Sequence, residues 1–357
     1  MITSKSQFIK NEIYRKIVSG ELRAESRLLP ERELMRQYKV SYATMSRALN
    51  DLKAAGVIDR KWGKGTFVLG IKKMVKNIAV TFGSNVAPSH PWMVPIIRGI
   101  GEEVGQFGYH MQLFPLSENA IFGLREQSLL NKLISNGDIN GVIALSPHSP
   151  EDIQKLTSLE LPVVTVGNEY PYSGVPSVLP DIEGGIRQVF DYLVSGLGHK
   201  RLGIILGPKR EHSARLSRMT TRLGDALLHL LGEYKLQHYA RTVHVEQQWE
   251  AVSGIAHDWL LSSERPTAIF VSDDILAVEI LKLAGELGLK VPQDLNIVGW
   301  GDILHHSQLT SVHVPLVAMG KSSVNIINEV VSGLKPQSVY VPTRLIVRES
   351  SGKLVHK

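Results

Sequence analysis

Two sets of side chains near the start of the chain have the chemistry to contact nucleic acid. Side chains at the start of a recognition helix meet base edges in the major groove. The first set stands at the start of a predicted helix and consists of Tyr42, Thr44, Ser46 and Arg47. The second set, Lys61 and Lys64, flanks Trp62-Gly63 and has ammonium groups suited to phosphates or the minor groove. Both sets need a small folded scaffold to position them.

Helical periodicity supplies the first two elements of that scaffold. Apolar residues recur at nearly helical spacing at Phe8, Ile9, Ile13 and Ile17, which predicts a helix over 5–18. Ser19-Gly20 ends that helix, because glycine tolerates the left-handed conformation. Pro30 can begin a second helix over 30–37, because its missing N–H is not needed there.

A third helix and a hairpin complete the predicted module. Ser41 is expected to cap a helix that runs to residue 55. Its inward side chains are Met45, Ala48, Leu49 and Leu52. Short β-like runs at 57–61 and 66–69, joined through glycines, predict a hairpin. Three helices and a basic hairpin predict a winged helix-turn-helix at 1–70; a protein-binding three-helix module is the alternative on fold alone.

Charge is distributed unevenly along the 357 residues. Residues 1–76 carry 17 Lys and Arg against 7 Asp and Glu, a net charge of +10. Residues 77–357 carry 23 against 27, a net charge of −4, so the total is +6. A basic block confined to a folded segment favours a polyanion partner. Residues 71–76 read as a basic linker that either touches the phosphate backbone or is a solvated connector.

Residues 77–357 alternate strand-like and helix-like segments. The predicted strands are 77–82, 109–114, 141–145, 162–166, 202–206, 240–245, 268–271 and 295–298. The predicted helices are 94–107, 124–135, 149–159, 181–194, 215–231, 248–261 and 274–287. This pattern predicts parallel sheets covered on both faces, arranged as two α/β lobes in series. A ligand would sit between the lobes, at the carboxyl ends of the strands.

Motifs for catalysis are missing, which argues against an enzyme. Gly320-Lys321-Ser322 lacks the earlier glycine of a P-loop, and Gly99-Ile100-Gly101 lies inside a predicted helix rather than after a strand. The absence of cysteine rules out disulfides, iron–sulfur clusters and a cysteine nucleophile. No histidine has metal-ligand spacing, and His305-His306 reads as a loop pair. We therefore expect neither a cofactor nor a metal.

The first 70 residues resemble the GntR family of bacterial repressors. The resemblance rests on three stretches in the right order and spacing: Leu29-Pro30-Glu31-Arg32-Glu33-Leu34, Val40-Ser41-Tyr42-Ala43-Thr44-Met45-Ser46-Arg47-Ala48-Leu49 and Gly63-Lys64-Gly65-Thr66-Phe67-Val68. It implies that Arg32 contacts DNA and places Ser41, Gly65 and Thr66 in the binding surface. The family usually has arginines where this chain has Tyr42 and Ser46, so its base preference is expected to differ, because only arginine bonds guanine bidentately.

The remainder, from about residue 76 to 351, resembles the LacI/GalR effector-binding domain, which is built like periplasmic sugar-binding proteins. The matching pieces are Gly198-His199-Lys200-Arg201-Leu202-Gly203, Pro266-Thr267-Ala268-Ile269-Phe270, Val291-Pro292-Gln293-Asp294-Leu295-Asn296-Ile297-Val298-Gly299-Trp300, Leu309-Thr310-Ser311-Val312 and Arg344-Leu345-Ile346-Val347-Arg348-Glu349-Ser350. Fusions of GntR-type readers to LacI-type sensors often sense sugars such as arabinose.

The second resemblance implies a set of ligand-binding residues. These are Asn85, His90, Trp92, Ser146, Asn168, Asp181, Arg222, Asp273, Trp300 and Asp302. Ser146, Asn168 and Asp181 follow strands or precede a helix, so each is either a ligand contact or only a cap. Arg222 can donate two parallel hydrogen bonds to vicinal hydroxyls or a carboxylate, or it forms an interlobe salt bridge. Trp92 stacks on a sugar ring or packs as an interface tryptophan. Asp273 stands where the family has a ligand-contacting asparagine, and Asp274 is expected to cap the following helix.

One further position departs from the family pattern. The family has an aspartate after its glycine-aromatic pair, whereas this chain has Gly299-Trp300-Gly301-Asp302. One hydroxyl acceptor is therefore lost or supplied differently, and the identity of a particular sugar does not transfer.

Together these features predict a homodimeric DNA-binding transcriptional regulator, a repressor of an approximately palindromic operator, controlled by a small ligand of the sugar class. The domains are expected at 1–70, 71–76 (linker) and 77–357. Two alternatives stay open: a regulator controlled by a protein partner with a degenerate cleft, and a sugar- or nucleotide-processing enzyme. The N-terminus has no apolar signal region, and no apolar run approaches ~20 residues, so a cytoplasmic location without membrane contact is expected.

Overall fold

The N-terminal module, which we call the reader, contains three helices and a hairpin. The computed structural model describes residues 5–18, 21–54, 56–61, 64–69, 77–83, 90–116, 129–145, 150–158, 161–170, 173–207, 218–245, 249–304, 308–331 and 334–353. The elements of the reader are α1 (Lys5–Val18), α2 (Glu31–Tyr38), α3 (Tyr42–Ala54), β1 (Ile58–Lys61) and β2 (Gly65–Val68). The predicted winged helix-turn-helix is therefore present, with element boundaries that differ from the prediction by at most one residue.

The core of the reader follows the predicted helical stripes with one exception. Ile9, Ile13 and Ile17 of α1 are buried, as are the four inward side chains predicted for α3. Phe8 was expected in this core, but its side chain is 58% exposed. The buried stripe of α1 runs through 9, 13 and 17 together with Tyr14, so position 8 falls on its solvent side.

The described chain divides into two compact units. Unit 1 consists of Met1–Pro88, Met93–Leu179 and Val317–Val339, and unit 2 of Ser89–Trp92, Pro180–Leu316 and Tyr340–Lys357. The two sheets were predicted as successive lobes. The chain instead returns to unit 1 near its end, so the two lobes are interleaved rather than strictly in series.

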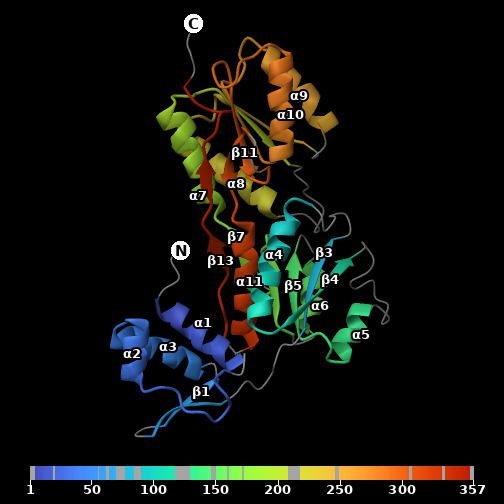
Figure 1. Cartoon of the computed structure of the whole chain (residues 1–357). Coiled ribbons are helices and arrows are strands. Elements are labelled where there is room, and N and C mark those ends of the chain that lie inside the picture. Colours follow the sequence, from blue (N-terminus) through green and yellow to red (C-terminus); the bar gives the residue numbers. More distant parts are fainter. Residues whose placement is uncertain are drawn as a thin grey trace. The chain divides into compact units, whose positions relative to one another are not determined.

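Unit 1 contains a six-stranded sheet with the order β13-β7-β6-β5-β3-β4. Its strands are β3 (Asn77–Gly83), β4 (His110–Leu116), β5 (Gly141–Leu145), β6 (Val163–Val166), β7 (Ser177–Pro180) and β13 (Val339–Val341). Strand β13 passes from unit 1 into unit 2 at Tyr340. Its helices are α4 (Met93–Gln106), α5 (Leu129–Ser135), α6 (Pro150–Ser158) and α11 (Leu316–Val331). Strands β5 and β6 are buried at every position, as expected for parallel strands covered on both faces. Figure 1 shows these strands beside α4 and α11.

Two glycine motifs considered as phosphate loops are explained by the packing of α4 on α11. A Cβ on Gly99 would lie 2.1 Å from the carbonyl oxygen of Val317, and one on Gly320 would lie 2.2 Å from that of Ile96. The two glycines therefore let the helix backbones approach each other directly. Gly320-Lys321-Ser322 and Gly99-Ile100-Gly101 are parts of this helix contact.

Unit 2 contains the second six-stranded sheet, with the order β14-β12-β11-β10-β8-β9. Its strands are β8 (Leu202–Leu206), β9 (Ala240–His244), β10 (Ala268–Val271), β11 (Asn296–Gly301), β12 (Thr310–His313) and β14 (Arg344–Ile346). Its helices are α7 (Ile182–Phe190), the π-helix η1 (Asp191–Gly196), α8 (Arg218–Glu233), α9 (Trp249–Leu261) and α10 (Asp274–Glu286). All pairs except the antiparallel edge pair β12–β14 are parallel.

Sequence periodicity missed several of these elements. No strand was predicted at β7, β12, β13 or β14, and no helix at α11. The missed strands are three or four residues long, too short to establish a period. No described helix is long and apolar enough to cross a membrane.

Candidate functional site

The start of α3 presents the first predicted set of DNA contacts. The backbone N–H of Thr44 donates to Ser41 Oγ at 3.4 Å, so Ser41 caps the helix as expected. Because Met45, Ala48 and Leu49 face the core, the intervening positions face outward. Tyr42 is 61% exposed and Arg47 is exposed, while Thr44 and Ser46 are half-buried.

The wing is an antiparallel hairpin in which Lys61 pairs with Gly65. Lys61 and Lys64 are exposed, and Lys61 Nζ lies 5.6 Å from the centroid of the Phe67 ring. Gly65 has a φ of 106°, which a residue with a side chain rarely adopts. Thr66 is half-buried on the returning strand, and Trp62-Gly63 lies outside the described residues. The two lysines are therefore available at the tip of the wing.

Two arginines of the reader have different surroundings. Arg32 is exposed on α2, as its predicted role requires. The guanidinium of Arg60 donates to Glu31 Oε2 at 2.8 Å and to Asn50 Oδ1 at 2.6 Å. Arg60 thus joins the wing to α2 and α3, holding the wing beside the recognition helix.

Sequence reasoning missed Arg27, which lies at the base of the wing. Residue 27 forms an isolated bridge with Phe67, and a Cβ on Gly65 would lie 2.5 Å from Arg27 Nε. Arg27 is exposed. The available signal was a basic residue just before the buried Leu28, in a segment with no periodicity of its own.

In unit 1, one predicted ligand residue is described in full. Asn168 follows β6 and is 5% exposed, and its carbonyl oxygen accepts a hydrogen bond from Thr165 Oγ1 at 2.8 Å. Among the described residues, no donor reaches its side-chain Oδ1. A buried acceptor in this state favours a ligand donor. Asn85 and Ser146 lie outside the described residues.

Two carboxylates of unit 2 cap helices. Asp181 Oδ1 accepts the N–H of Gly184 at the start of α7, at 3.0 Å. Asp273 Oδ1 accepts the N–H groups of Ile275 and Leu276, at 2.9 and 3.1 Å. Asp274 was expected to cap α10, and that expectation was wrong. Residue 273 has extended backbone angles, so its side chain reaches the first turn, and Asp274 begins the helix itself.

The buried Asp274 side chain instead forms hydrogen bonds near the ends of β10, β11 and β12. Its Oδ1 accepts from Ser311 Oγ at 2.6 Å, and its Oδ2 accepts from the N–H of Ile303 at 2.9 Å. Burial raises the pKa of Asp274 to about 6, against the opposing effect of these hydrogen bonds. The carboxylate therefore holds the segment after β11 to β12.

Asp302 lies in an ion-pair cluster at the carboxyl end of β11. Its carboxylate lies 2.7 Å from the Arg348 guanidinium and 3.1 Å from His313 Nδ1. Burial works against ionisation, but the hydrogen bonds from His313 and Arg348 outweigh it and lower the pKa. Asp302, one residue after the position where the family has an aspartate, is thus already paired with Arg348 and His313 of unit 2.

The two tryptophans predicted as ligand contacts differ in exposure. Trp300 is 1% exposed and packs on α7, where a Cβ on Gly185 would lie 3.1 Å from its Cζ3. Trp92 is half-buried, and its backbone N–H donates to His90 Nδ1 at 3.3 Å. Trp92 lies against Gly301, so His90 and Trp92 gather at the carboxyl end of β11 beside Asp302.

Arg222 lies on α8, at the amino-terminal part of the helix. Its guanidinium carbon lies 5.2 Å from the centroid of the Tyr340 ring, within the range of a cation–π contact. The ring therefore supports the guanidinium plane. The described residues contain no group of three His, Asp or Glu side chains that could hold a metal ion, and His305-His306 lies outside them.

Two family models match this chain, one in its N-terminal part and one in its C-terminal part. Residues 5–68 match the bacterial regulatory proteins of the gntR family, and residues 190–351 match the periplasmic binding protein-like domain. The arabinose metabolism transcriptional repressor of Geobacillus stearothermophilus is 26% identical over 364 residues, covering 97% of each chain. The HTH-type transcriptional repressor PurR of Escherichia fergusonii is 26% identical over 272 residues, covering 72% of this chain and 76% of its own.

Solved structures share the fold of the larger region. A LacI-family regulatory protein from Chloroflexus aggregans superposes with a TM-score of 0.66 at 25% identity, covering 77% of this chain and 98% of its own. A LacI transcriptional regulator from a Rhodococcus species gives a TM-score of 0.66 at 19% identity, covering 79% and 100%. The chain therefore is a DNA-binding transcriptional regulator, in which a gntR-family reader precedes a periplasmic-binding-protein-like domain of the LacI-regulator fold.

Proposed function

We propose that this regulator is a homodimeric repressor that binds an approximately palindromic operator and releases it in response to a sugar. The observation that carries the proposal is the reading surface of the reader. Tyr42 and Arg47 are exposed at the start of a capped helix, beside a wing that carries Lys61 and Lys64. Side chains at the helix start specify bases, and lysines on the wing hold phosphates.

The effector is proposed to be a hydroxyl-rich small molecule. Asn168 supplies a buried acceptor, and Arg222 supplies paired donors supported by Tyr340. Trp92, His90 and Asp273 add an aromatic face and polar groups at the carboxyl ends of strands, where ligands of parallel sheets bind. The relative named as an arabinose metabolism repressor, which is similar over both domains, supports a sugar.

Linkage gives the regulatory mechanism. An effector that binds the DNA-free form better lowers operator affinity, and bound operator lowers effector affinity by the same factor. Such coupling has a typical size of ~1–3 kcal/mol. Equal effector affinity with and without operator would contradict the mechanism.

The DNA half of the proposal is tested by selection from a random duplex library with the full-length protein. The expected product is a pair of related half-sites, because a two-fold dimer presents two readers. Arg32→Ala and Lys64→Ala should weaken binding to all sequences and each reduce the salt slope by ~1. Arg60→Lys is the control variant. The Arg60 guanidinium bonds Glu31 and Asn50 within the reader, so this substitution should leave the salt slope unchanged. Recovery of no sequence would overturn the proposal.

The effector half is tested by thermal shift against pentoses, hexoses, sugar acids, sugar phosphates and purines. A ligand at a hundred times its Kd stabilises the folded state by ~2.7 kcal/mol, which the assay detects. A shift with one sugar that is lost in Arg222→Ala supports the proposal. Chemical conversion of that sugar by the protein would favour an enzyme. No shift with any compound, together with a protein that co-purifies stoichiometrically, would favour a regulator controlled by a protein partner.

A further inference from the structure

Helix α1 of the reader is joined to α11, which lies in the same compact unit, by a partly buried ion pair. Lys10 Nζ lies 3.1 Å from Glu329 Oε1, and Gln7 Nε2 donates to the same oxygen at 2.6 Å. The side chain of Lys10 is 7% exposed and that of Glu329 is 19% exposed. Loss of one partner leaves the other charge buried and unpaired, which is far costlier than at an exposed pair. The contact is therefore selective for this arrangement of reader and lobe.

Glu329 is held firmly on the lobe side of the contact. The preceding residue, Asn328, accepts a hydrogen bond from Tyr109 Oη at 2.9 Å. Asn325 Nδ2 donates to Glu103 Oε1 at 3.2 Å, one turn earlier on α11. Together with the close backbone approach at Gly99 and Gly320, these bonds fix the end of α11 on α4 and β4. Glu329 is therefore expected to move only together with α11.

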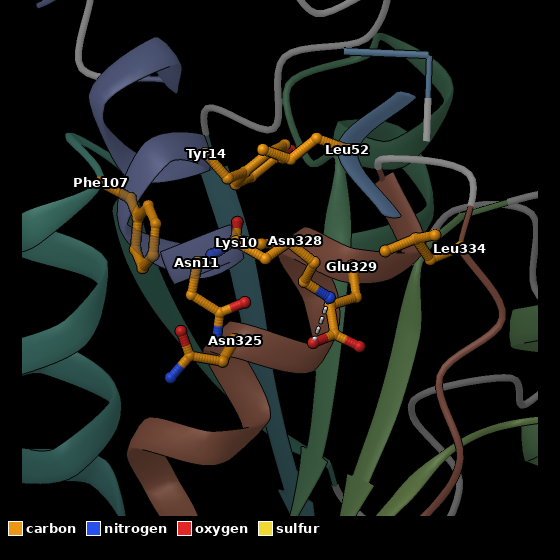
Figure 2. A pocket seen from close by; sticks show the side chains of 9 residues that line it. All are labelled: Lys10, Asn11, Tyr14, Leu52, Phe107, Asn325, Asn328, Glu329 and Leu334. Atoms are coloured by element: carbon orange, nitrogen blue, oxygen red, sulfur yellow. Dashed lines mark hydrogen bonds and ion pairs between the residues drawn. The ribbon is translucent and has the colours of Figure 1, made fainter. Parts of the chain in front are cut away.

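Apolar packing across the same contact is incomplete. Figure 2 shows a pocket beside the ion pair, lined by Tyr14 and Leu52 of the reader, with Phe107 and Leu334 at its opposite ends. Atoms that line a void forgo part of their dispersion contacts. The polar bonds to Glu329 therefore add a directional attraction between reader and lobe beside this apolar contact.

The ion pair lies at one end of α11, and the other end of this helix lies where the chain enters unit 1. Helix α11 begins where the chain passes from unit 2 to unit 1, at Leu316 and Val317, and carries Glu329 in its last turn. On the reader, Leu52 near the end of α3 faces the pocket, while Tyr42 at its start is 61% exposed. Docking on α11 consequently leaves the reading side chains accessible.

We propose that Gln7, Lys10 and Glu329 form a latch, which fixes the orientation of the reader relative to the sheet and helices in the rest of unit 1. The latch sets the half-site spacing that a dimer accepts, and it carries a change at the start of α11 to the reader. The inference rests on the proposed function, because only a DNA-binding dimer has half-sites to space.

Docking itself is tested by pulsed electron paramagnetic resonance on the full-length chain. The chain contains no cysteine, so Lys53→Cys on α3 and Arg98→Cys on α4 give two defined labelling sites at exposed positions. One narrow distance distribution within a protomer is expected when the doubly labelled chain is diluted into an excess of unlabelled protein, so that a dimer carries only one labelled protomer. Glu329→Lys, which opposes two ammonium groups, should broaden the distribution, as should Lys10→Met. The exchanged pair Lys10→Glu with Glu329→Lys should narrow it again.

A matched control separates the latch from a general effect of charge. Glu279 and Lys282 form an exposed pair at 2.6 Å on α10, and Glu279→Lys should leave the distance distribution unchanged. Near-ultraviolet circular dichroism checks that each variant is folded. Distributions for folded Glu329→Lys and Lys10→Met that superimpose on the parent's would overturn the latch.

The consequence for DNA is tested with the half-site pair obtained by selection. Affinity is measured for a single half-site and for pairs whose spacer is lengthened or shortened. Latch variants should lose roughly tenfold of the spacer discrimination, the usual size of coupling between sites, with single half-site affinity unchanged. Retained discrimination would overturn the role of the latch in setting half-site spacing. Failure to select any DNA would overturn the proposed function, whereas the label distances test the docking contact independently.

Discussion

The indole of Trp92 lies against the backbone of Gly301, with its Cζ2 atom 2.8 Å from the place where a Cβ on residue 301 would stand. Gly301 also has a φ of 128°. A side chain at position 301 is therefore opposed in two ways, because the Trp92 ring fills its space and the backbone angle disfavours any residue but glycine. Asp302, the neighbouring acid, is bound by Arg348 and His313. The carboxyl end of β11 thus offers an aromatic surface in place of a free carboxylate.

Gly301→Ala should lower the free energy of unfolding by ~1–3 kcal/mol, because both the backbone angle and the Trp92 contact oppose the new methyl group. Chemical denaturation measures the loss. In a Trp92→Ala background, Gly301→Ala should cost less unfolding free energy, because the clash with the indole is gone. The part of the loss that comes from the backbone angle should remain. Gly285→Ala in α10, where nothing lies within 4 Å, is the control and should be neutral or slightly stabilising. An equal loss in both backgrounds would remove Trp92 from the explanation.

Asp274 should make stability depend on pH in a defined direction. Its pKa of about 6 lies above the value near 3.9 of an unfolded chain, so the folded state binds more protons between about pH 4 and pH 6. This contribution is present at low pH and is lost as the pH rises through that window, by up to about 3 kcal/mol. The measurement is the difference in unfolding free energy between the parent and Asp274→Asn across pH 4 to 7. Parallel curves would contradict the assignment.

Arg47→Ala should relax sequence preference at one base pair by ~1–3 kcal/mol while leaving phosphate contacts in place. The reason is the exposed position of Arg47 near the capped start of α3. Competitive selection with the variant measures the change in the preferred sequence. Lys53→Ala, at the exposed end of the same helix, should keep the original preference. An unchanged preference in Arg47→Ala would mean that a different face of α3 reads the bases.

Arg222→Ala should abolish the response to the effector with operator affinity unchanged. The guanidinium is supported by the Tyr340 ring, so Tyr340→Ala should weaken the response and Tyr340→Phe should preserve it. Operator titrations with and without the sugar found by thermal shift give the measurement. Simultaneous loss of operator binding in Arg222→Ala would instead assign the residue a role in folding.

Local patterns in the sequence were sufficient for the reader. Ser41 caps α3, and Met45, Ala48, Leu49 and Leu52 are buried as the helical period predicts, because capping and amphipathicity depend on residues within a few positions of one another. The strands of both sheets other than β7, β12, β13 and β14 were predicted from their apolar runs, since continuous apolar runs mark strands covered on both faces. Motif order along the chain was enough to predict the regulator class.

Only the tertiary structure decided features that join distant residues. The return of α11 to unit 1, the exchange of roles between Asp273 and Asp274, and the contact of Trp92 with Gly301 depend on packing partners that no local period encodes. The bond between Lys10 and Glu329 spans 319 positions of sequence. The sequence by itself therefore determined most of the elements and which side chains the reader exposes at the start of α3. The tertiary structure decided how polar groups are shared, because a buried charge or acceptor is satisfied by whatever group the fold brings beside it.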